Sequence, residues 1–553
     1  MALNKNKIII YQVFTRLYGN KNTTRKEDGT LAENGCGKLN DFTPKTLKNI
    51  KAMGVSHIWY TGVIRHATQS DYTKYGIPRQ HSAVVKGKAG SPYAIADYYD
   101  IDPDLAENID QRMQEFEALV ERTHKAGLKI IIDFVPNHVA RQYHSICKPE
   151  DVKDLGEGDK PQIGFTPENN FYYCPGQRFT PYLDLYHGES EPYVEEPAKA
   201  TGNDCFHNAP GMNDWYETVK LNYGVDYYAG GVGHYSPIPN TWDKMTDILL
   251  FWAAKGVDGF RCDMAEMVPA AFWHWATDKV KYRYPECVFI GEVYNPAEYR
   301  NYLGAGFDYL YDKVGMYDTL RGVICGQQSA HAITGAWQQT DDIRQHMLYF
   351  LENHDEQRIA SDFFAGDGRK GVPGFVVSAL LQQNPLMVYF GQEYGERGMD
   401  KEGFSGMDGR TTIFDYWSVD TIVRAANNKY TLREKHLYDM YCKVMNIAQD
   451  EKAITKGEMF DLMYANGHLQ RQYAFLRKVG SEVLLVIANF ADTPTMVNVN
   501  MPAHAFNYLG LSEKNALATD LLTGNKQRLP LKLDGIVTVE VPENGAVVLK
   551  FKA

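Results

Sequence analysis

The sequence has little that would indicate a metal cluster, a disulfide framework or a nucleic-acid partner. Its eight cysteines are scattered and none forms a CxxC pair, which argues against a metal cluster and against a disulfide scaffold in a chain of 553 residues. The formal net charge is -11 and no basic run occurs. A protein that binds nucleic acid needs a positive surface, so that class of partner is not expected.

Long hydrophobic runs are also missing. The polar residues 1–7 lead directly into an expected strand at Ile8–Phe14, with no secretory hydrophobic segment before it. No apolar run is long enough to span a bilayer. We therefore expect a cytoplasmic protein without a membrane partner, unless a signal peptide has been removed from the chain. The sequence does not predict the oligomeric state.

Aromatic residues, by contrast, are abundant, with 37 tyrosines and 8 tryptophans. Aromatic surfaces suit sugar rings, although core packing accounts for most aromatics in most proteins.

The length of the chain exceeds what one hydrophobic core supports, so two or three domains are expected.

Buried strands and amphipathic helices alternate along most of the chain. Apolar strands are expected near residues 8, 57, 129, 257, 288, 307, 347 and 386. Eight such units predict an α/β protein whose core is a closed (β/α)8 barrel, formed by residues 1–138 and 241–449. A polar loop is expected at residues 18–41, strands at Val257–Asp263, Phe307–Tyr309 and Met347–Asp355, and one helix through residues 420–449.

Two segments interrupt or follow this alternation. Residues 139–240 are rich in Gly, Pro, Tyr and Asn without a clear period, which indicates a subdomain inserted after the third strand. Residues 450–553 contain short strands separated by turns, which predicts a C-terminal antiparallel β-sandwich.

The chemistry of a (β/α)8 barrel lies at the carboxyl ends of its strands. Charged and polar side chains follow four of the expected strands: Asn137 and His138, Arg261 and Asp263, Glu292, and His354 and Asp355. Any one of them could be structural, and a single histidine more often is. Three carboxylates, two histidines and one arginine at one mouth are less easily explained without a site.

Arg261 and Asp263 are two residues apart in an extended strand, so their side chains point the same way. A guanidinium beside a carboxylate favours its ionised form, so we expect Arg261 to hold Asp263 charged. An ordinary ion pair at a strand end is the alternative for this stretch alone.

The chain resembles the α-amylase family, glycoside hydrolase family 13, in four motifs that occur in the family's order. They are Asp133-Phe-Val-Pro-Asn-His138, Gly259-Phe-Arg-Cys-Asp263, Phe289-Ile-Gly-Glu-Val293 and Glu352-Asn-His-Asp355. Weaker matches are Val219-Lys-Leu-Asn222 and Pro385–Glu393.

The resemblance implies a role for each of these residues. Asp263 would be the nucleophile, Glu292 the general acid and base, and Asp355 the carboxylate that binds and distorts the sugar. Arg261 would orient Asp263, His138 and His354 would bind sugar hydroxyls, and Tyr93 would stack on the sugar at the cleavage point. Tyr93 could instead be a loop aromatic covering the barrel rim, and Asp133 is assigned to the scaffold.

The spacing of strands suits these roles. Retaining cleavage needs two carboxyl groups about 5 to 5.5 Å apart, and neighbouring strands lie about 4.8 Å apart. Asp263 and Glu292 follow adjacent strands, and their proximity would let Glu292 hold a proton near neutral pH.

The implied function is retaining hydrolysis of α-1,4-glucosidic bonds in maltodextrins, glycogen or starch, with an α-glucan as the partner. A transglycosylase with a sugar acceptor is the alternative enzyme. A non-catalytic amylase-like binding protein is the alternative from another class, but such relatives usually have damaged carboxylates.

The Lys-His pair that typical starch amylases carry beyond the nucleophile is absent, because Met264-Ala-Glu266 follows Asp263. This weakens the case for long starch chains.

The resemblance also raises the question of calcium. Asn137 occupies the position where family members often bind Ca²⁺, and it is the only candidate ligand. Calcium prefers six to eight oxygens with carboxylates, and the fifth motif carries Lys220-Leu-Asn222 where an acidic form is usual. We therefore expect no required cofactor, with calcium optional. Trp215 and Tyr223 of the insertion are expected near the sugar or in the core of the subdomain.

Overall fold

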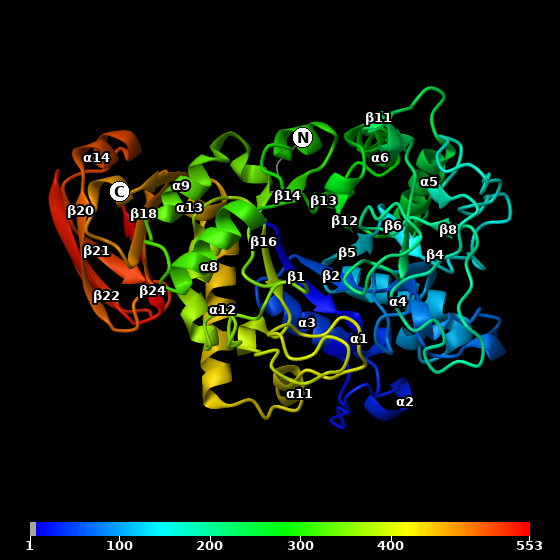
Figure 1. The fold of residues 1–553 in the computed structure, drawn as a ribbon. Coiled ribbons are helices and arrows are strands. Elements are labelled where there is room, and N and C mark those ends of the chain that lie inside the picture. Colours follow the sequence, from blue (N-terminus) through cyan, green and yellow to red (C-terminus); the bar gives the residue numbers. More distant parts are fainter. Residues whose placement is uncertain (1–6) are drawn as a thin grey trace.

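A computed structural model of the chain describes residues 7–553. Eight parallel strands form a barrel at the centre of the molecule, in the spatial order β15-β14-β13-β12-β5-β2-β1-β16 (Figure 1). The two end strands meet at a parallel bridge from Tyr349 to Leu386, which closes the ring. The predicted (β/α)8 fold is confirmed. The strands are β1 (Ile9–Phe14), β2 (His57–Thr61), β5 (Lys129–Phe134), β12 (Gly259–Cys262), β13 (Val288–Gly291), β14 (Tyr309–Tyr311), β15 (Met347–Leu348) and β16 (Leu386–Tyr389).

Most barrel strands lie within about one residue of the expected bounds, and three differ by more than that at one end or at both. β12 is shorter at both ends than Val257–Asp263, β14 begins two residues later than expected, and β15 ends at Leu348 instead of Asp355. β15 is short because the chain changes partner: the Leu348 carbonyl accepts from Asp312, whereas the Tyr349 amide already donates to Pro385 before β16. Tyr349 still bridges to Leu386, and the residues from Phe350 to Asp355 leave the ladder and lead to the mouth of the barrel.

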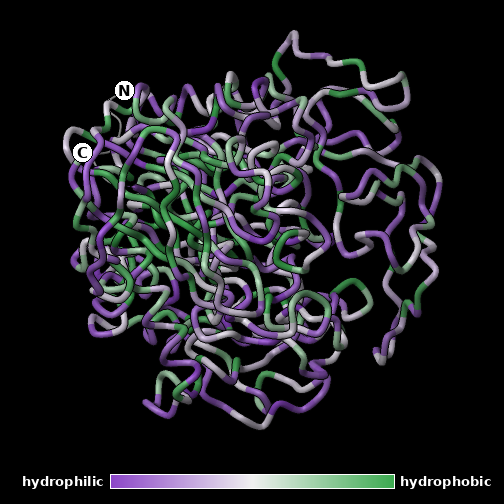
Figure 2. The backbone as a smooth tube through the Cα atoms, turned by 90° about the vertical axis from the view of Figure 1, so that its left-hand side faces the viewer, coloured by the Kyte–Doolittle hydropathy of each residue, from purple (hydrophilic) through white to green (hydrophobic). Residues whose placement is uncertain are grey.

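The barrel interior is filled by side chains that point inward from alternate positions of the strands. This inner cluster includes Ile8, Ile10, Trp59, Ile131, Ile290, Tyr311, Leu348, Phe350 and Met387. Outward positions such as Ile9, Tyr11 and Val13 join the larger core between strands and helices. The hydrophobic segments accordingly gather inside the molecule and hydrophilic ones in its outer loops (Figure 2).

Amphipathic helices cover the outside of the barrel. In α3 (Pro44–Ala52), Thr43 caps the amino end by accepting a hydrogen bond from the Thr46 amide, and Leu47 and Ile50 are buried. The other long helices around the barrel are α4 (Arg112–Lys125), α5 (Asn240–Ala254), α6 (Ala270–Arg283), α10 (Val372–Leu380) and α12 (Leu432–Asp450). All nine residues of α10 are buried, because this helix lies between the barrel and the C-terminal sheet.

Two expectations about irregular and helical segments were wrong in detail. The single helix expected through residues 420–449 is two helices, α11 (Asp420–Ala426) and α12. Thr431 starts α12 with a capping box to Glu434, after Asn428 adopts a φ of 54°. The expected loop at residues 18–41 contains a short helix, α2 (Leu31–Asn34), which a capping box between Thr30 and Glu33 starts.

The insertion leaves the barrel through β6 (His138–Ala140), which pairs antiparallel with β9 (Thr218–Lys220). His138 lies opposite Lys220 in this pair. Between these strands the chain is largely irregular, with the short pair β7 (Tyr173–Cys174) and β8 (Ala198–Lys199). In Figure 1 the insertion lies on the side of the barrel away from the C-terminal domain.

The C-terminal domain contains a six-stranded antiparallel sheet and a second, two-stranded sheet, as expected for a β-sandwich. The first has the order β17 (Glu458–Asp461), β18 (Gln472–Val479), β19 (Glu482–Asn489), β24 (Gly545–Lys552), β21 (Lys514–Asp520) and β22 (Lys526–Leu531). The second pairs β20 (Thr495–Met501) with β23 (Gly535–Val541). Buried Arg477 joins the domain to the barrel by donating to the carbonyls of Leu381 and Ala453.

Candidate active site

A cleft of about 240 Å³ opens at the carboxyl end of the barrel strands. It is bordered by barrel residues, by the loop that follows β3 (Ile64–His66), by the insertion and by residues 413–414. Its lining residues are Lys86, Ser91, Tyr93, His138, Trp215, Glu217, Thr218, Asp263, Met264, Glu292, Tyr294, Asp355, Ile413 and Phe414. Five of the seven predicted catalytic and sugar-binding residues are in this lining: Tyr93, His138, Asp263, Glu292 and Asp355.

Arg261 lies beneath the cleft and binds two of these carboxylates at once. One guanidinium nitrogen is 2.7 Å from Oδ1 of Asp263, and the other is 2.7 Å from Oε2 of Glu292. The strand register explains this arrangement: Arg261 is paired with Ile290 and Cys262 with Gly291, so Asp263 and Glu292 follow the ends of adjacent strands at the same level. The side chains of Arg261 and Asp263 point the same way, as their spacing predicts.

Arg261 itself rests on the aromatic upper layer of the barrel interior. Its guanidinium carbon lies 5.2 Å from the ring centre of Trp59 and 5.6 Å from that of Tyr311. Asp133, on β5, is 3.5 Å from the guanidinium and accepts a hydrogen bond from the Trp59 indole. A buried cation held on several sides in this way is a rigid point to which the carboxylates attach.

Burial has a larger effect on the pKa of Asp263 than the sequence indicated. Burial raises the pKa of Asp263 well above its usual value, Glu292 and Asp355 raise it further, and Arg261 opposes both effects. The expectation that Arg261 lowers the pKa of Asp263 is therefore wrong in its net direction, because burial outweighs the guanidinium. More carboxyl groups than cations surround this point, so the cluster favours retaining a proton.

Glu292 is held by two contacts that the sequence analysis missed. The backbone amide of Met264 donates to Oε2 at 2.8 Å, which requires the left-handed turn that Met264 makes with φ 44°. The hydroxyl of Tyr294 donates to Oε1 at 2.5 Å. Tyr294 is two residues after Glu292, so the period of an extended chain could have indicated that both face the cleft.

Asp355 and His354 form a second group with Tyr93. Nε2 of His354 lies 2.6 Å from the Tyr93 hydroxyl and 3.1 Å from Oδ2 of Asp355. Nδ1 is 2.9 Å from the Gln12 amide, which fixes the ring from behind. Burial raises the pKa of Asp355, but His354 outweighs that effect and the result is about 2. The side chain of Asp355 is 41% exposed, so a charged carboxylate faces the cleft.

His138 is a neutral imidazole at the edge of the cleft. Burial, with the charges of Lys220 and Lys86, lowers its pKa to about 3. Its ring lies 5.2 Å from the ring of Trp215 and within 3.2 Å of the Asn137 amide. Gly202 packs directly on it, because a Cβ at this glycine would lie 2.9 Å from the imidazole.

The two insertion aromatics have different environments. Trp215 is half-buried and lines the cleft beside His138. Tyr223 is 2% exposed, donates to the Pro136 carbonyl and packs on Phe272, so the expectation that it lies near the sugar was wrong. The sequence could not distinguish the environments of Trp215 and Tyr223, because both lie beside polar residues in a segment without a regular hydrophobic period.

The side chains around Asn137 do not fit a calcium ion. Its Oδ1 accepts from the ammonium of Lys220 at 2.7 Å, and the same ammonium is 2.6 Å from Asp204. Its Nδ2 donates to the Gly202 carbonyl at 2.7 Å. A buried lysine thus stands where a divalent cation would need oxygen ligands, and no catalytic step is assigned to a metal.

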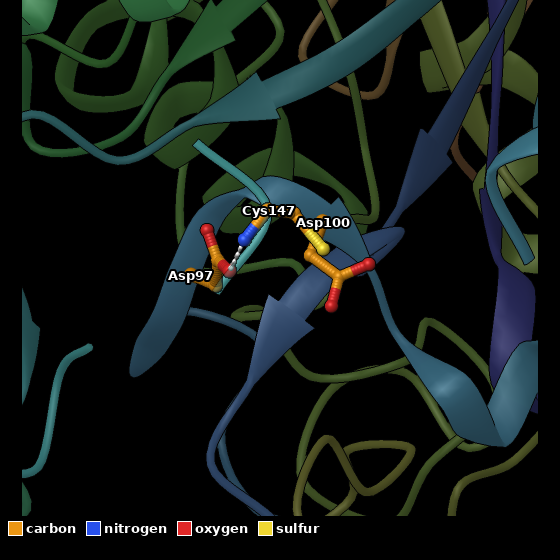
Figure 3. A group of neighbouring side chains, drawn as sticks. All are labelled: Asp97, Asp100 and Cys147. Atoms are coloured by element: carbon orange, nitrogen blue, oxygen red, sulfur yellow. Dashed lines mark hydrogen bonds between the residues drawn. The ribbon is translucent and has the colours of Figure 1, made fainter. Parts of the chain in front are cut away.

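A second group of possible ligands consists of Asp97, Asp100 and Cys147 (Figure 3). None of the three is among the residues that line the cleft. Both carboxylates are already neutralised: Arg65 is 3.2 Å from each, and Arg112 is 2.6 Å from Asp100. Burial raises the pKa of the Cys147 thiol to about 12, which keeps it protonated at neutral pH. The group is therefore accounted for as a set of ion pairs without a metal. Asp97 also accepts hydrogen bonds from the amides of Ile146 and Cys147, which anchors the loop at residues 144–147.

Within residues 7–553, no helix is both long and apolar enough to cross a membrane.

Comparison with known proteins agrees with the geometry. The family model described as "Alpha amylase, catalytic domain" matches residues 12–453. Alpha-amylase 3 of Dictyoglomus thermophilum is 23% identical over 97% of this chain and 93% of its own length. Neopullulanase 2 of Thermoactinomyces vulgaris is 21% identical over 89% of this chain and 71% of its own length.

Solved structures share the same fold along the whole chain. The maltogenic α-amylase AmyB of Thermotoga neapolitana superimposes with a TM-score of 0.64, at 20% identity, over all of both chains. The α-amylase of Geobacillus thermoleovorans in complex with acarbose gives a TM-score of 0.65, at 18% identity, over 99% of both chains.

Proposed function

Because this chain belongs to the α-amylase family of glycoside hydrolases, we propose that it cleaves α-1,4-glucosidic bonds of maltodextrins, glycogen or starch with retention of configuration. The observation that carries the proposal is the sharing of one buried guanidinium by two carboxylates, with Arg261 at 2.7 Å from both Asp263 and Glu292. Two carboxyl groups held side by side are what a double-displacement reaction requires.

In the proposed reaction, a carboxylate oxygen of Asp263 attacks the anomeric carbon of the bound glucosyl unit. The bond from that carbon to the leaving sugar breaks, and Glu292 donates a proton to the leaving oxygen. Glu292 then removes a proton from water, which attacks the glycosyl ester and releases Asp263.

The remaining polar residues would bind the transferred sugar. Tyr93 offers a ring face above Arg261, at 5.4 Å from the guanidinium carbon. Neutral His138 and the His354–Asp355 pair border the same space and can bond hydroxyls. Sugar rings have apolar faces and polar edges, so an aromatic face with polar neighbours suits them.

The leaving-group side of the cleft differs from that of starch amylases. Glu266, where the usual Lys-His pair is absent, accepts hydrogen bonds from the amides of Tyr294 and Asn295. Its carboxylate therefore stabilises the loop after β13 instead of gripping a chain. We expect maltooligosaccharides to be better substrates than starch.

The test is a substrate screen with maltooligosaccharides, glycogen, pullulan, trehalose and sucrose, whose products are resolved by length and linkage. Each reaction is run with and without a second sugar as acceptor. Hydrolysis of α-1,4 bonds to α-configured products supports the proposal. Products that appear only with an acceptor would favour transglycosylation, and the absence of any turnover would contradict both.

A further inference from the structure

A buried lysine in the wall of the cleft has no role in the reaction described so far. Lys86 lies in the loop after β3, and its side chain is 10% exposed. It reaches across to the insertion, where its ammonium is 3.0 Å from Oε2 of Glu217 and 3.3 Å from the Asp214 carbonyl. Burying such a pair is costly, and replacing it by apolar side chains is often neutral for stability.

The hydrogen-bond inventory of this ammonium is incomplete. A lysine has three N–H donors. In the described chain this ammonium donates one hydrogen bond, to the Asp214 carbonyl, forms an ion pair with Glu217 and lies 5.1 Å from the centre of the Tyr216 ring. Lys86 and Glu217 are both among the residues that line the cleft. With one hydrogen bond made and Glu217 and Tyr216 beside it, the ammonium retains N–H capacity that can bond a hydroxyl of a ligand in the cleft that Lys86 lines.

The position of Lys86 indicates which part of a sugar chain it would meet. Lys86 and the His138 imidazole both line the cleft, and the ammonium of Lys86 binds the carbonyl of Asp214. Trp215, next in the chain to Asp214, packs on the same imidazole. Glu292 and Tyr294, which would face the leaving group, come from β13 and the loop after it.

We propose that Lys86, with Trp215 beside it, binds the glucosyl unit next to the transferred one, on its non-reducing side. Trp215 supplies a ring face, and Lys86 donates a hydrogen bond to a hydroxyl. Glu217 is a positioning residue that holds the ammonium in place. This inference rests on the proposed function and makes the length of the transferred oligosaccharide a determinant of rate.

Two activated substrates isolate this contact. α-Glucosyl fluoride places one sugar on the donor side, whereas α-maltosyl fluoride adds the neighbouring unit, and the leaving group is the same. The quantity measured is the ratio of kcat/KM for maltosyl fluoride to that for glucosyl fluoride. Losing a hydrogen bond from a charged donor costs about 1.5 to 3 kcal/mol, so Lys86→Met should lower the ratio roughly 10- to 100-fold.

The controls separate this role from a structural one. Lys160→Met removes an exposed lysine that also pairs with a glutamate of the insertion, and it should keep the wild-type ratio. The double variant Lys86→Met, Glu217→Gln leaves no uncompensated buried charge and should show the same low ratio, with a melting temperature close to that of the wild type.

An unchanged ratio in both Lys86 variants, or an equal loss on both fluorides, would overturn the inference. Wild-type enzyme that turns over neither fluoride would instead contradict the proposed function, so the two failures are distinguishable.

Discussion

The ammonium of Lys220 lies 2.7 Å from Oδ1 of Asn137, in the pair of strands that joins the insertion to the barrel. Asp204 binds the same ammonium at 2.6 Å. An internal cation therefore links the two parts of the structure where a bound metal ion would otherwise be needed.

We predict that stability does not depend on calcium. Chelation should leave the melting temperature of the wild-type enzyme unchanged, whereas Lys220→Met should lower it, because Asn137 and Asp204 lose their partner. The expected loss is about 2 kcal/mol. Thermal unfolding with and without chelator measures both effects. A fall of many degrees on chelation of the wild type would contradict the prediction.

The second prediction contrasts the two aromatics of the insertion. Trp215→Ala should raise KM for maltooligosaccharides about 10-fold or more with little loss of stability, because Trp215 is half-buried and borders the cleft. Tyr223→Ala should destabilise the fold by about 3 to 5 kcal/mol, because Tyr223 is fully packed. Kinetics and denaturant unfolding of both variants test this. Loss of folding in the Trp215 variant with unchanged KM would contradict the assignment.

The third prediction concerns pH. Burial, with Lys129 and Lys51, lowers the pKa of His57 to about 4, from an unfolded value near 6.5. Between these values the unfolded chain binds a proton at His57 that the folded chain does not, so the contribution of His57 to stability falls as pH falls from about 6.5 towards 4. This histidine accounts for up to about 3 kcal/mol of that loss.

His57→Gln should therefore flatten the stability curve in this range. Unfolding free energies of wild type and variant at pH 7 and pH 4.5 provide the measurement. An equal dependence on pH in both proteins would contradict the assignment of the titration to His57.

Much of this fold could be predicted because barrel strands are buried on both faces. Apolar runs such as Ile8–Phe14 and Leu128–Asp133 are readily interpreted as such buried strands. Because the strands of a barrel are parallel, the polar residues at their carboxyl ends must lie together at one mouth of the barrel. The ends of β14 and β15 could not be predicted, since they depend on which neighbour accepts each backbone hydrogen bond.

Two residues that reach the cleft from loops could not be predicted from the sequence either. Lys86 and Glu217 come from segments without periodicity, and each is an ordinary surface residue type until the other is placed beside it. The direction of the Asp263 pKa shift was mistaken for a related reason, because the extent of burial is a property of the folded chain.

The division of labour between Asp263 and Glu292 is the central claim, and trapping tests it most directly. Glu292→Gln removes the proton donor but leaves Asp263 able to attack an α-glycosyl fluoride, whose leaving group needs no proton. The variant should accumulate a glycosyl ester that mass spectrometry of peptides locates on Asp263, because breakdown of the ester also needs Glu292.

Azide extends this measurement. It needs no general base, so it should restore turnover of the Glu292→Gln variant. The product should be an α-glycosyl azide, because the ester on Asp263 is β-linked and azide displaces it with inversion, whereas Asp263→Asn should give no such product. An ester on Asp263 with azide rescue of the Glu292 variant is the result that the account predicts. An ester on another residue, a β-glycosyl azide from the Glu292 variant, an α-glycosyl azide from the Asp263 variant, or full activity in both variants would contradict it.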